Sequence, residues 1–255
     1  KISDLEKKEI KLKKIESNLK DKRILDILVN DKIIYVSAVN IKNNCEILNL
    51  YKADINLESL KFKNIFNSSE CVSLIQSGRI QKINKKGKNL IYLSTAADNL
   101  KRVDEKDSKP QDDNSIFGKI IQINEDNLKY KIFSKGHRNI LGLYVDNNKI
   151  LATENGPRGG DEINKIEENE NYGFDVASYG EKYKKNNLNV KDYQRSHEDF
   201  GFKEPLFSFV PSIGITEITF LFFLQISKTS SNVLHASTSA FLNKLLLHFE
   251  NSYFY

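Results

Sequence analysis

Three short polar runs lie close together in the middle of this chain and contain residue types suited to binding an anion and a hard cation. The first is Gly136 to Asn139, the second extends from Glu154 to Asn164, and the third is Asn171 to Gly173. Guanidinium and amide groups bind carboxylates well, and carboxylate and carbonyl oxygens are the ligands that calcium prefers. The runs therefore predict a pocket in which an anionic ligand lies beside a divalent cation.

The elements that would position these runs read as short strands. One strand type occurs three times, at Ile33 to Ala38, Leu90 to Thr95 and Ile150 to Thr153, and each copy runs into a polar loop. The copies recur after 57 and 59 residues, counted from Ile34 through Ile91 to Ile150, which suits a repeat somewhat longer than a typical propeller blade of about 40 to 50 residues. Further strands are predicted at Arg79 to Ile83, Gly118 to Ile123, Tyr130 to Ser134 and Gly142 to Val145. The pattern favours an all-β propeller over a sandwich.

Composition limits the classes of protein to consider. The chain has 255 residues with 39 basic and 34 acidic side chains, and the lysines lie in mixed-sign stretches, so we expect a solvated surface and no nucleic-acid partner. The longest apolar stretch, near Phe220 to Leu224, is far shorter than the roughly 20 residues of a membrane-spanning helix, so no membrane span is expected. Cys45 and Cys71 are compatible both with a disulfide and with buried free thiols.

The character of the chain changes along its length. We divide it into a charged N-terminal segment at 1–22, propeller blades at 23–216 and an atypical apolar tail at 217–255. Within the tail, the spacing of Phe241, Leu245 and Phe249 is typical of an amphipathic helix. The loop from Asp104 to Asn114 is predicted to be a solvated insertion.

A family resemblance rests on several of these motifs together. The runs Ser115 to Ile120, Gly136 to Asn139, Glu154 to Asn164 and Asn171 to Gly173 resemble, in order and spacing, the soluble glucose/sorbosone dehydrogenases. The resemblance covers about residues 22 to 216 and implies a six-bladed type of propeller. Because the family's later blades are not recognisable after Thr216, we expect an incomplete propeller of about four blades, with a tail that is either frame-shifted or a different terminus.

The resemblance also implies cofactors and the residues that bind them. Such enzymes transfer a hydride from the anomeric carbon of a sugar to pyrroloquinoline quinone with the help of calcium. By similarity, the carbonyls of Gly156 and Pro157 would hold the calcium beside the quinone. Glu162 and the backbone of Tyr172 would match part of a second, structural calcium site. Arg138 and Asn139 would face the quinone.

Each of these residues also has a simpler interpretation. Arg138 could form a salt bridge between blades, and Glu162 could cap a loop. Gly156-Pro157 is by itself an ordinary turn dipeptide, so its metal role rests on the resemblance. His137 is interpreted as a structural histidine, because the family's catalytic base lies elsewhere.

The position of that base is the main departure from the family. The family has a histidine that opens a His-x-Gly-x-Arg type of motif, and the matching stretch here runs from Ile75 to Arg79. The histidine position is Ile75, or Gln76 after a slip of one residue, and neither side chain accepts a proton near neutral pH. Asp98 is a weak substitute, so no general base is identified. Leu141 replaces a polar residue of the family.

Three functions from different classes remain open at this point. The first is a quinone-dependent aldose dehydrogenase, periplasmic or secreted, with a small sugar as substrate and an unknown electron acceptor. Its turnover depends on a base that the sequence does not supply. The alternative is a non-catalytic propeller that binds calcium together with a carbohydrate or a protein partner. The third is a purely structural propeller in an interaction protein, in which the polar motifs are blade turns.

Overall fold

The computed structural model describes residues 14–43, 45–56, 58–97, 109–146, 149–183 and 192–218, together with the backbone of two further strands at 225–228 and 234–237. Asp98 and the helix predicted around Phe241 lie outside the described residues. No helix in the described part is long and apolar enough to cross a membrane. The only helical element found there is a single 3-10 turn, η1 (Glu198–Phe200).

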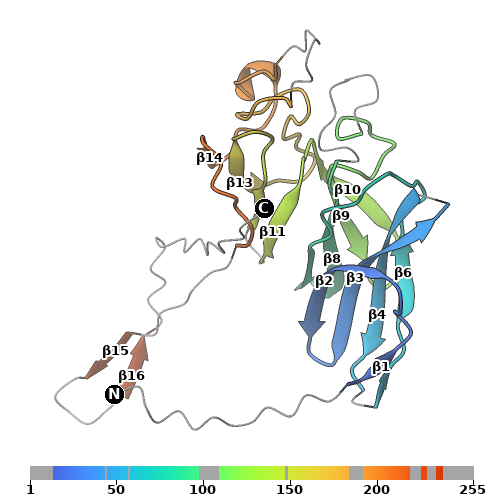
Figure 1. Ribbon diagram of the computed structural model, residues 1–255. Coiled ribbons are helices and arrows are strands. Elements are labelled where there is room, and N and C mark those ends of the chain that lie inside the picture. Colours follow the sequence, from blue (N-terminus) through green and yellow to red (C-terminus); the bar gives the residue numbers. More distant parts are fainter. Residues whose placement is uncertain are drawn as a thin grey trace, which may run out of the picture.

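The fold consists mainly of three antiparallel sheets of four strands each (Figure 1). Every sheet is a meander in which strands consecutive in the sequence are neighbours, apart from the short β5 that precedes β6. Sheet 1 contains β2 (Arg23–Asn30), β3 (Ile33–Lys42), β4 (Cys45–Asp54) and β6 (Lys63–Asn67). Sheet 2 contains β7 (Ile80–Lys85), β8 (Lys88–Ser94), β9 (Lys119–Asn124) and β10 (Tyr130–Lys135). Sheet 3 contains β11 (Ile140–Val145), β12 (Ile150–Glu154), β13 (Asp161–Ile166) and β14 (Phe207–Phe209).

Two small sheets complete the described structure. β1 (Glu16–Ser17) pairs in parallel with β5 (Ser59–Leu60), and β15 (Gln225–Lys228) pairs antiparallel with β16 (Leu234–Ser237). The structure therefore has four antiparallel sheets, of which three have the four strands of a propeller blade.

The repeat seen in the sequence is the blade repeat. The three similar stretches fall in β3, β8 and β12, and each of these is the second strand of its sheet. These strands are buried on both faces, which explains why they read as continuous apolar runs. The expected intervals of 57 and 59 residues are thus the distance from one sheet to the next along the chain.

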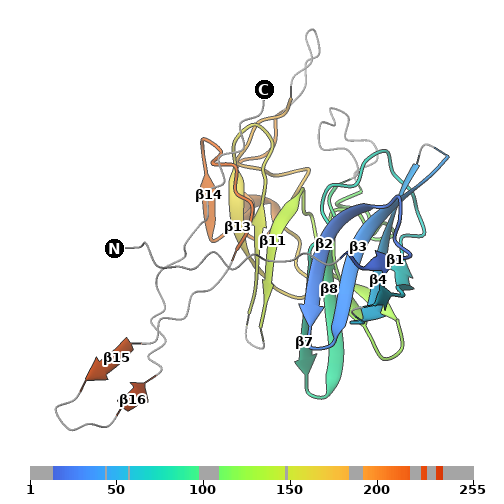
Figure 2. The ribbon, with the colours of Figure 1, turned by 60° about the horizontal axis from the view of Figure 1, so that its bottom comes forward.

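The sheets stack through their first strands and through two apolar cores. The first strand of sheet 2, β7, contacts the first strands of both neighbours, β2 and β11. One core, which includes Leu50, Ile91 and Phe117, lies between sheets 1 and 2, and a second, which includes Ile120 and Leu143, lies between sheets 2 and 3. Each such side chain, when fully buried, contributes about 1.5–3 kcal/mol. Figure 2 shows the sheets side by side as an open arc and not as a closed ring.

A disulfide between Cys45 and Cys71 settles the alternative that the sequence left open. The two Cα atoms are 5.5 Å apart, and the bond ties the start of β4 to the segment that precedes β7. The same segment is held by Glu46, whose carboxylate accepts the backbone N–H of Ile75.

The loop predicted as a solvated insertion is partly packed in its described portion. Asp112, Asp113 and Asn114 are exposed, as expected, but Pro110 is buried. The ammonium group of Lys119, which has no exposed surface, donates to the carbonyl oxygens of Lys109 at 2.6 Å and Phe117 at 2.9 Å. The loop is therefore anchored to the first residue of β9.

Candidate functional site

The loops at one end of the sheets bring together the polar runs found in the sequence. We call this the site end; it contains residues 136–139 and 155–160, and the other end contains the turns at 86–87 and 125–129. At the site end, the backbone N–H of Ala97 donates to Arg138 and that of His137 donates to Gly118. The start of sheet 3 is thereby fixed to the loops of sheet 2.

The hairpin between β12 and β13 is organised by Asp161. One carboxylate oxygen accepts the backbone N–H of Gly156 at 3.0 Å, and the other accepts the N–H groups of Ile213 and Ile215, each at 3.1 Å. Position 156 has room only for glycine, since a Cβ atom there would lie 2.2 Å from the carbonyl oxygen of Gly160. A single buried carboxylate therefore holds both the hairpin and the chain that follows β14.

Two buried glutamates face each other where β12 ends and β13 begins. Glu154 and Glu162 are direct partners in the antiparallel register, and their residues are 4% and 8% exposed. Like charges at such positions repel. Burial, followed by the charge of Glu154, raises the pKa of Glu162 to about 8. This pair is an arrangement that an added cation would stabilise.

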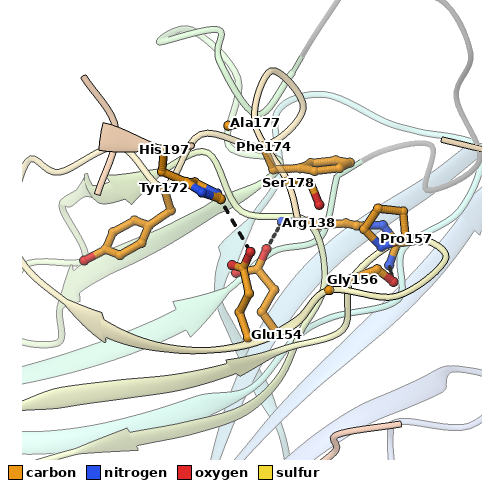
Figure 3. A pocket seen from close by; sticks show the side chains of 11 residues that line it. Arg138, Glu154, Gly156, Pro157, Tyr172, Phe174, Ala177, Ser178 and His197 are labelled. Atoms are coloured by element: carbon orange, nitrogen blue, oxygen red, sulfur yellow. Dashed lines mark hydrogen bonds and ion pairs between the residues drawn. The ribbon is translucent and has the colours of Figure 1, made fainter. Parts of the chain in front are cut away.

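Arg138 and His137 lie beside the glutamates from the start of sheet 3. The guanidinium of Arg138 donates to the carbonyl oxygens of Asn155 at 2.7 Å and Gly156 at 2.8 Å, and its backbone N–H bonds to Glu154. Its charged group lies 6.0 Å from the ring centre of Phe174. Burial lowers the pKa of Arg138, but a guanidinium remains charged at any pH of interest. Figure 3 shows the side chain of Arg138 extending toward Gly156 and Pro157, while Glu154 lies below its backbone.

His137 has the surroundings of a structural histidine. Its imidazole has no exposed surface, its Nδ1 atom is 3.0 Å from Glu154, and its Nε2 atom is 2.8 Å from the hydroxyl of Ser134. The ring also stacks on Tyr172, with ring centres 4.7 Å apart. These contacts agree with the interpretation made from the sequence and leave the imidazole inaccessible to a substrate.

His197 is a member of the site that the sequence analysis missed. Its Nε2 atom lies 3.8 Å from Glu162, and its ring stacks on Tyr179 at 5.2 Å. Figure 3 shows His197 beside Tyr172 and above Glu154. Burial lowers the pKa of this histidine, although Glu204 and Glu154 act in the opposite direction. The residue lies far along the chain from Glu162, in the long connection between β13 and β14, and no local motif marks it.

A small cavity is enclosed by the predicted residues together with those that were missed. The cavity has a volume of about 10 Å³, which is enough for about one water molecule or one metal ion. The lining comes from residues 138, 154, 156, 157, 160, 162, 172, 174, 177, 178 and 197. Of the predicted ligands, Arg138, Gly156, Pro157, Glu162 and Tyr172 therefore lie around one space.

Asn139 lies beside this cavity without lining it. Its backbone carbonyl accepts the N–H of Asn155 at 2.9 Å. Its side-chain oxygen is buried and has no hydrogen-bond partner within the part of the chain that the structure describes. An orphaned acceptor of this kind is costly unless a ligand or water satisfies it.

The two candidate positions for the missing base differ in the structure. Ile75 is 1% exposed and packs in the core between sheets 1 and 2, whereas Gln76 is exposed. Next to them, the hydroxyl of Ser77 donates to the carbonyl of Ile140 at 2.8 Å, which ties the segment to sheet 3. Position 76 is thus the one that presents a side chain at the surface.

Side chains alone do not form a metal cluster in the described residues, where no group of three or more His, Cys, Asp and Glu is arranged to hold an ion. A cation at the glutamate pair would need backbone carbonyl oxygens as additional ligands. Carbonyl ligands are common for calcium.

Four-stranded meanders stacked in an arc, with polar loops gathered at one end, define a β-propeller of the sugar dehydrogenase type. The chain belongs to the glucose/sorbosone dehydrogenase family, whose family model matches residues 17–241. It is 40% identical over 63 residues to the aldose sugar dehydrogenase YliI of Escherichia coli, a match that covers 24% of this chain and 17% of that protein.

Solved structures extend the similarity of the fold. A crystal structure of a glucose dehydrogenase matches with a TM-score of 0.64 and 20% identity, over 76% of this chain and 60% of that one. The structure of a PQQ-bound aldose sugar dehydrogenase from Streptomyces coelicolor matches with a TM-score of 0.56 and 18% identity, over 86% of this chain and 68% of that one. The chain thus spans about 60% of the length of the glucose dehydrogenase structure.

Proposed function

We propose that this chain belongs to a sugar dehydrogenase that oxidises aldoses at the anomeric carbon, and that its site end binds calcium and pyrroloquinoline quinone. The observation that carries the proposal is the buried pair of Glu154 and Glu162 beside a cavity of ionic size. A pair of facing carboxylates in a buried position is unfavourable unless a proton or a cation relieves the repulsion.

The donor set at the cavity fits a hard divalent ion. Glu162 would supply a carboxylate oxygen and Pro157 a carbonyl oxygen. Gly156 would add its carbonyl oxygen through the lone pair that the bond from Arg138 leaves unused. Tyr172, which also lines the cavity, would contribute through its backbone. Because the cavity holds about one small species, a quinone would have to lie outside it.

Arg138 and Asn139 are the residues that we assign to the quinone. When bound, pyrroloquinoline quinone supplies the acceptor for the hydride that leaves the sugar. The bonds from Arg138 to Asn155 and Gly156 fix the guanidinium next to the proposed calcium ligands, where its charge would stabilise negative charge on reduction. The orphaned side-chain oxygen of Asn139 would gain a partner. The structurally similar aldose sugar dehydrogenase from Streptomyces coelicolor is PQQ-bound, which supports the choice of cofactor.

One observation favours a second candidate function. Ile75 is a core residue and Gln76 is an amide, so neither of the positions expected for the base can accept a proton. General base catalysis typically contributes about 10²- to 10⁴-fold. The alternative is therefore a propeller that binds calcium and a carbohydrate or protein partner without turnover.

A binding experiment tests the proposed site. We expect calcium to bind the full chain in a calorimetric titration and the quinone to bind only when calcium is present. Glu162→Gln should abolish calcium binding, whereas Glu58→Gln, which removes an exposed carboxylate from the loop before β5, should leave it unchanged. Failure of both ligands to bind, or equal binding by the two variants, would reject the site.

A gain-of-function variant separates the two candidates. Gln76→His places an imidazole at the exposed position of the motif, and dye-linked oxidation of an aldose should then rise by up to about 10²- to 10⁴-fold. Ile75→His is the matched control, because position 75 is buried and its imidazole would not reach a substrate. If calcium and quinone bind but Gln76→His gives no turnover, the non-catalytic function is favoured.

The compartment and the substrate are further parts of the proposal. A disulfide such as Cys45–Cys71 persists in oxidising surroundings, which supports a periplasmic or secreted location. The substrate would be a small sugar.

A further inference from the structure

The end of the sheets opposite to the site end contains a second, larger cleft. Its volume is about 550 Å³, within the roughly 300–1,000 Å³ that is typical of ligand-binding pockets. The turn between β7 and β8 forms one wall, the turn between β9 and β10 forms another, and Glu168 contributes from beyond β13. This cleft is separate from the residues assigned to calcium and the quinone.

The cleft is strongly basic. Among the residues that line it are five lysines, at positions 85, 86, 88, 129 and 131, and a single acid, Glu168, which forms an ion pair with Lys131. Lys85 and Lys88 are direct partners across the β7–β8 hairpin, a pairing in which like charges repel. Four positive charges therefore remain after Glu168 is counted, and an anionic ligand would relieve their repulsion.

The remaining lining residues suit a sugar chain. Tyr130 is 48% exposed, and its ring packs edge-on against Phe66 with ring centres 5.2 Å apart, so one aromatic surface is held in place within the cleft. Asn127 lies beside it, and its side-chain oxygen accepts the N–H of Lys129 at 3.0 Å, which shapes the turn. Amides and a fixed aromatic ring recognise hydroxyl groups and the apolar face of a sugar.

We propose that this cleft binds an acidic oligosaccharide, a chain of sugars that carry carboxylate groups. The lysines would pair with the carboxylates, and Tyr130 and Asn127 would contact the rings. A concave cleft with amide side chains fits a narrow polar chain better than it fits a flat anionic membrane surface. Because the cleft lies at the other end of the sheets, such a chain would be bound without covering the site end.

Calorimetric titration of the full chain with a short oligogalacturonate tests this proposal, with a neutral cello-oligosaccharide of the same length as control. The acidic chain should bind and the neutral one should bind much more weakly. Raising the salt concentration from about 0.05 M to about 0.5 M should weaken the binding at least about tenfold, because the charges are exposed and screened. Equal binding of the two sugars, or no binding of either, would overturn the proposal.

Charge-reversal variants locate the binding. Lys88→Glu with Lys129→Glu should weaken oligogalacturonate binding at least about tenfold, while Lys42→Glu with Lys61→Glu, two exposed lysines outside the cleft, should not. Equal weakening by both pairs would indicate a general charge effect and reject the cleft. Binding to phosphatidylglycerol vesicles without binding to oligogalacturonate would also reject it in favour of a membrane surface.

Discussion

Two buried carboxylates at opposite ends of the sheets, Glu125 and Glu162, have very different surroundings. Their side chains are 7% and 10% exposed, but Glu125 as a residue is half-buried whereas Glu162 is buried. Glu125 accepts hydrogen bonds from Tyr35 and Lys52 of sheet 1 and from Lys82 of sheet 2. Glu162 faces another carboxylate, and the imidazole of His197 is 3.8 Å away.

The difference separates a carboxylate that stabilises the fold from one that is suited to a ligand. Burial alone would raise the pKa of Glu125, but the bonds from Lys52, Lys82 and Tyr35 outweigh it and lower that pKa to about 2. Burial and Glu154 raise the pKa of Glu162. Local rules of stability are commonly violated at functional sites, and the glutamate pair is such a violation.

The largest expected effect is on the free energy of unfolding and concerns Glu125, the carboxylate with two lysine partners. Glu125→Gln should lower the free energy of unfolding by about 3 kcal/mol or more, because two lysines lose their buried counter-charge. Urea denaturation measures the change, and Glu58→Gln serves as the surface control. A loss of less than about 1 kcal/mol, the range of exposed ion pairs, would show that the cluster is not effectively buried.

The next effect concerns calcium. At a calcium concentration about 100 times the dissociation constant, the folded chain should gain about 2.7 kcal/mol, and this gain should vanish in Glu162→Gln. In a chelating buffer near neutral pH the same variant should unfold at about the same temperature as the wild type, since the raised pKa already keeps Glu162 largely protonated and glutamine resembles that neutral form. Thermal unfolding with and without calcium measures both changes. A variant that is strongly destabilised in chelator would mean that Glu162 has a structural partner.

A smaller effect concerns the contribution of Glu125 to stability at acidic pH. The pKa of Glu125 in the folded chain, about 2, lies below its ordinary value of 4.5, so its contribution to stability is present above about pH 4.5 and is lost as the pH falls toward 2. The difference in stability between wild type and Glu125→Gln should therefore narrow over that interval. A difference that stays constant from neutral pH to about pH 2.5 would contradict the low pKa. Urea titrations at a series of pH values provide the measurement.

Much of the fold could be predicted because the blades repeat. The stretches in β3, β8 and β12 are buried on both faces, so their apolar character appears directly in the sequence. The number of strands per sheet and the pairing of Cys45 with Cys71 depend on contacts across the fold, and the sequence left the disulfide open.

The candidate site was only partly predictable, for a similar reason. Gly156, Glu162 and Arg138 belong to short motifs, and the structure places them around one cavity. Glu154 and Glu162 face each other only because of the register of a hairpin, and His197 comes from a loop that is distant in the sequence. The basic cleft combines turns of different hairpins, so its lysines read in the sequence as ordinary surface charge.

Asp161 has a consequence for how the site end could respond to the rest of the protein. Its two oxygens bind the N–H of Gly156 on one side and those of Ile213 and Ile215 on the other. A displacement of the chain where it leaves sheet 3 would therefore be transmitted through one side chain to a proposed calcium ligand. The affinity for the proposed ion would in this way be mechanically coupled to the segments that pack against residues 213–215.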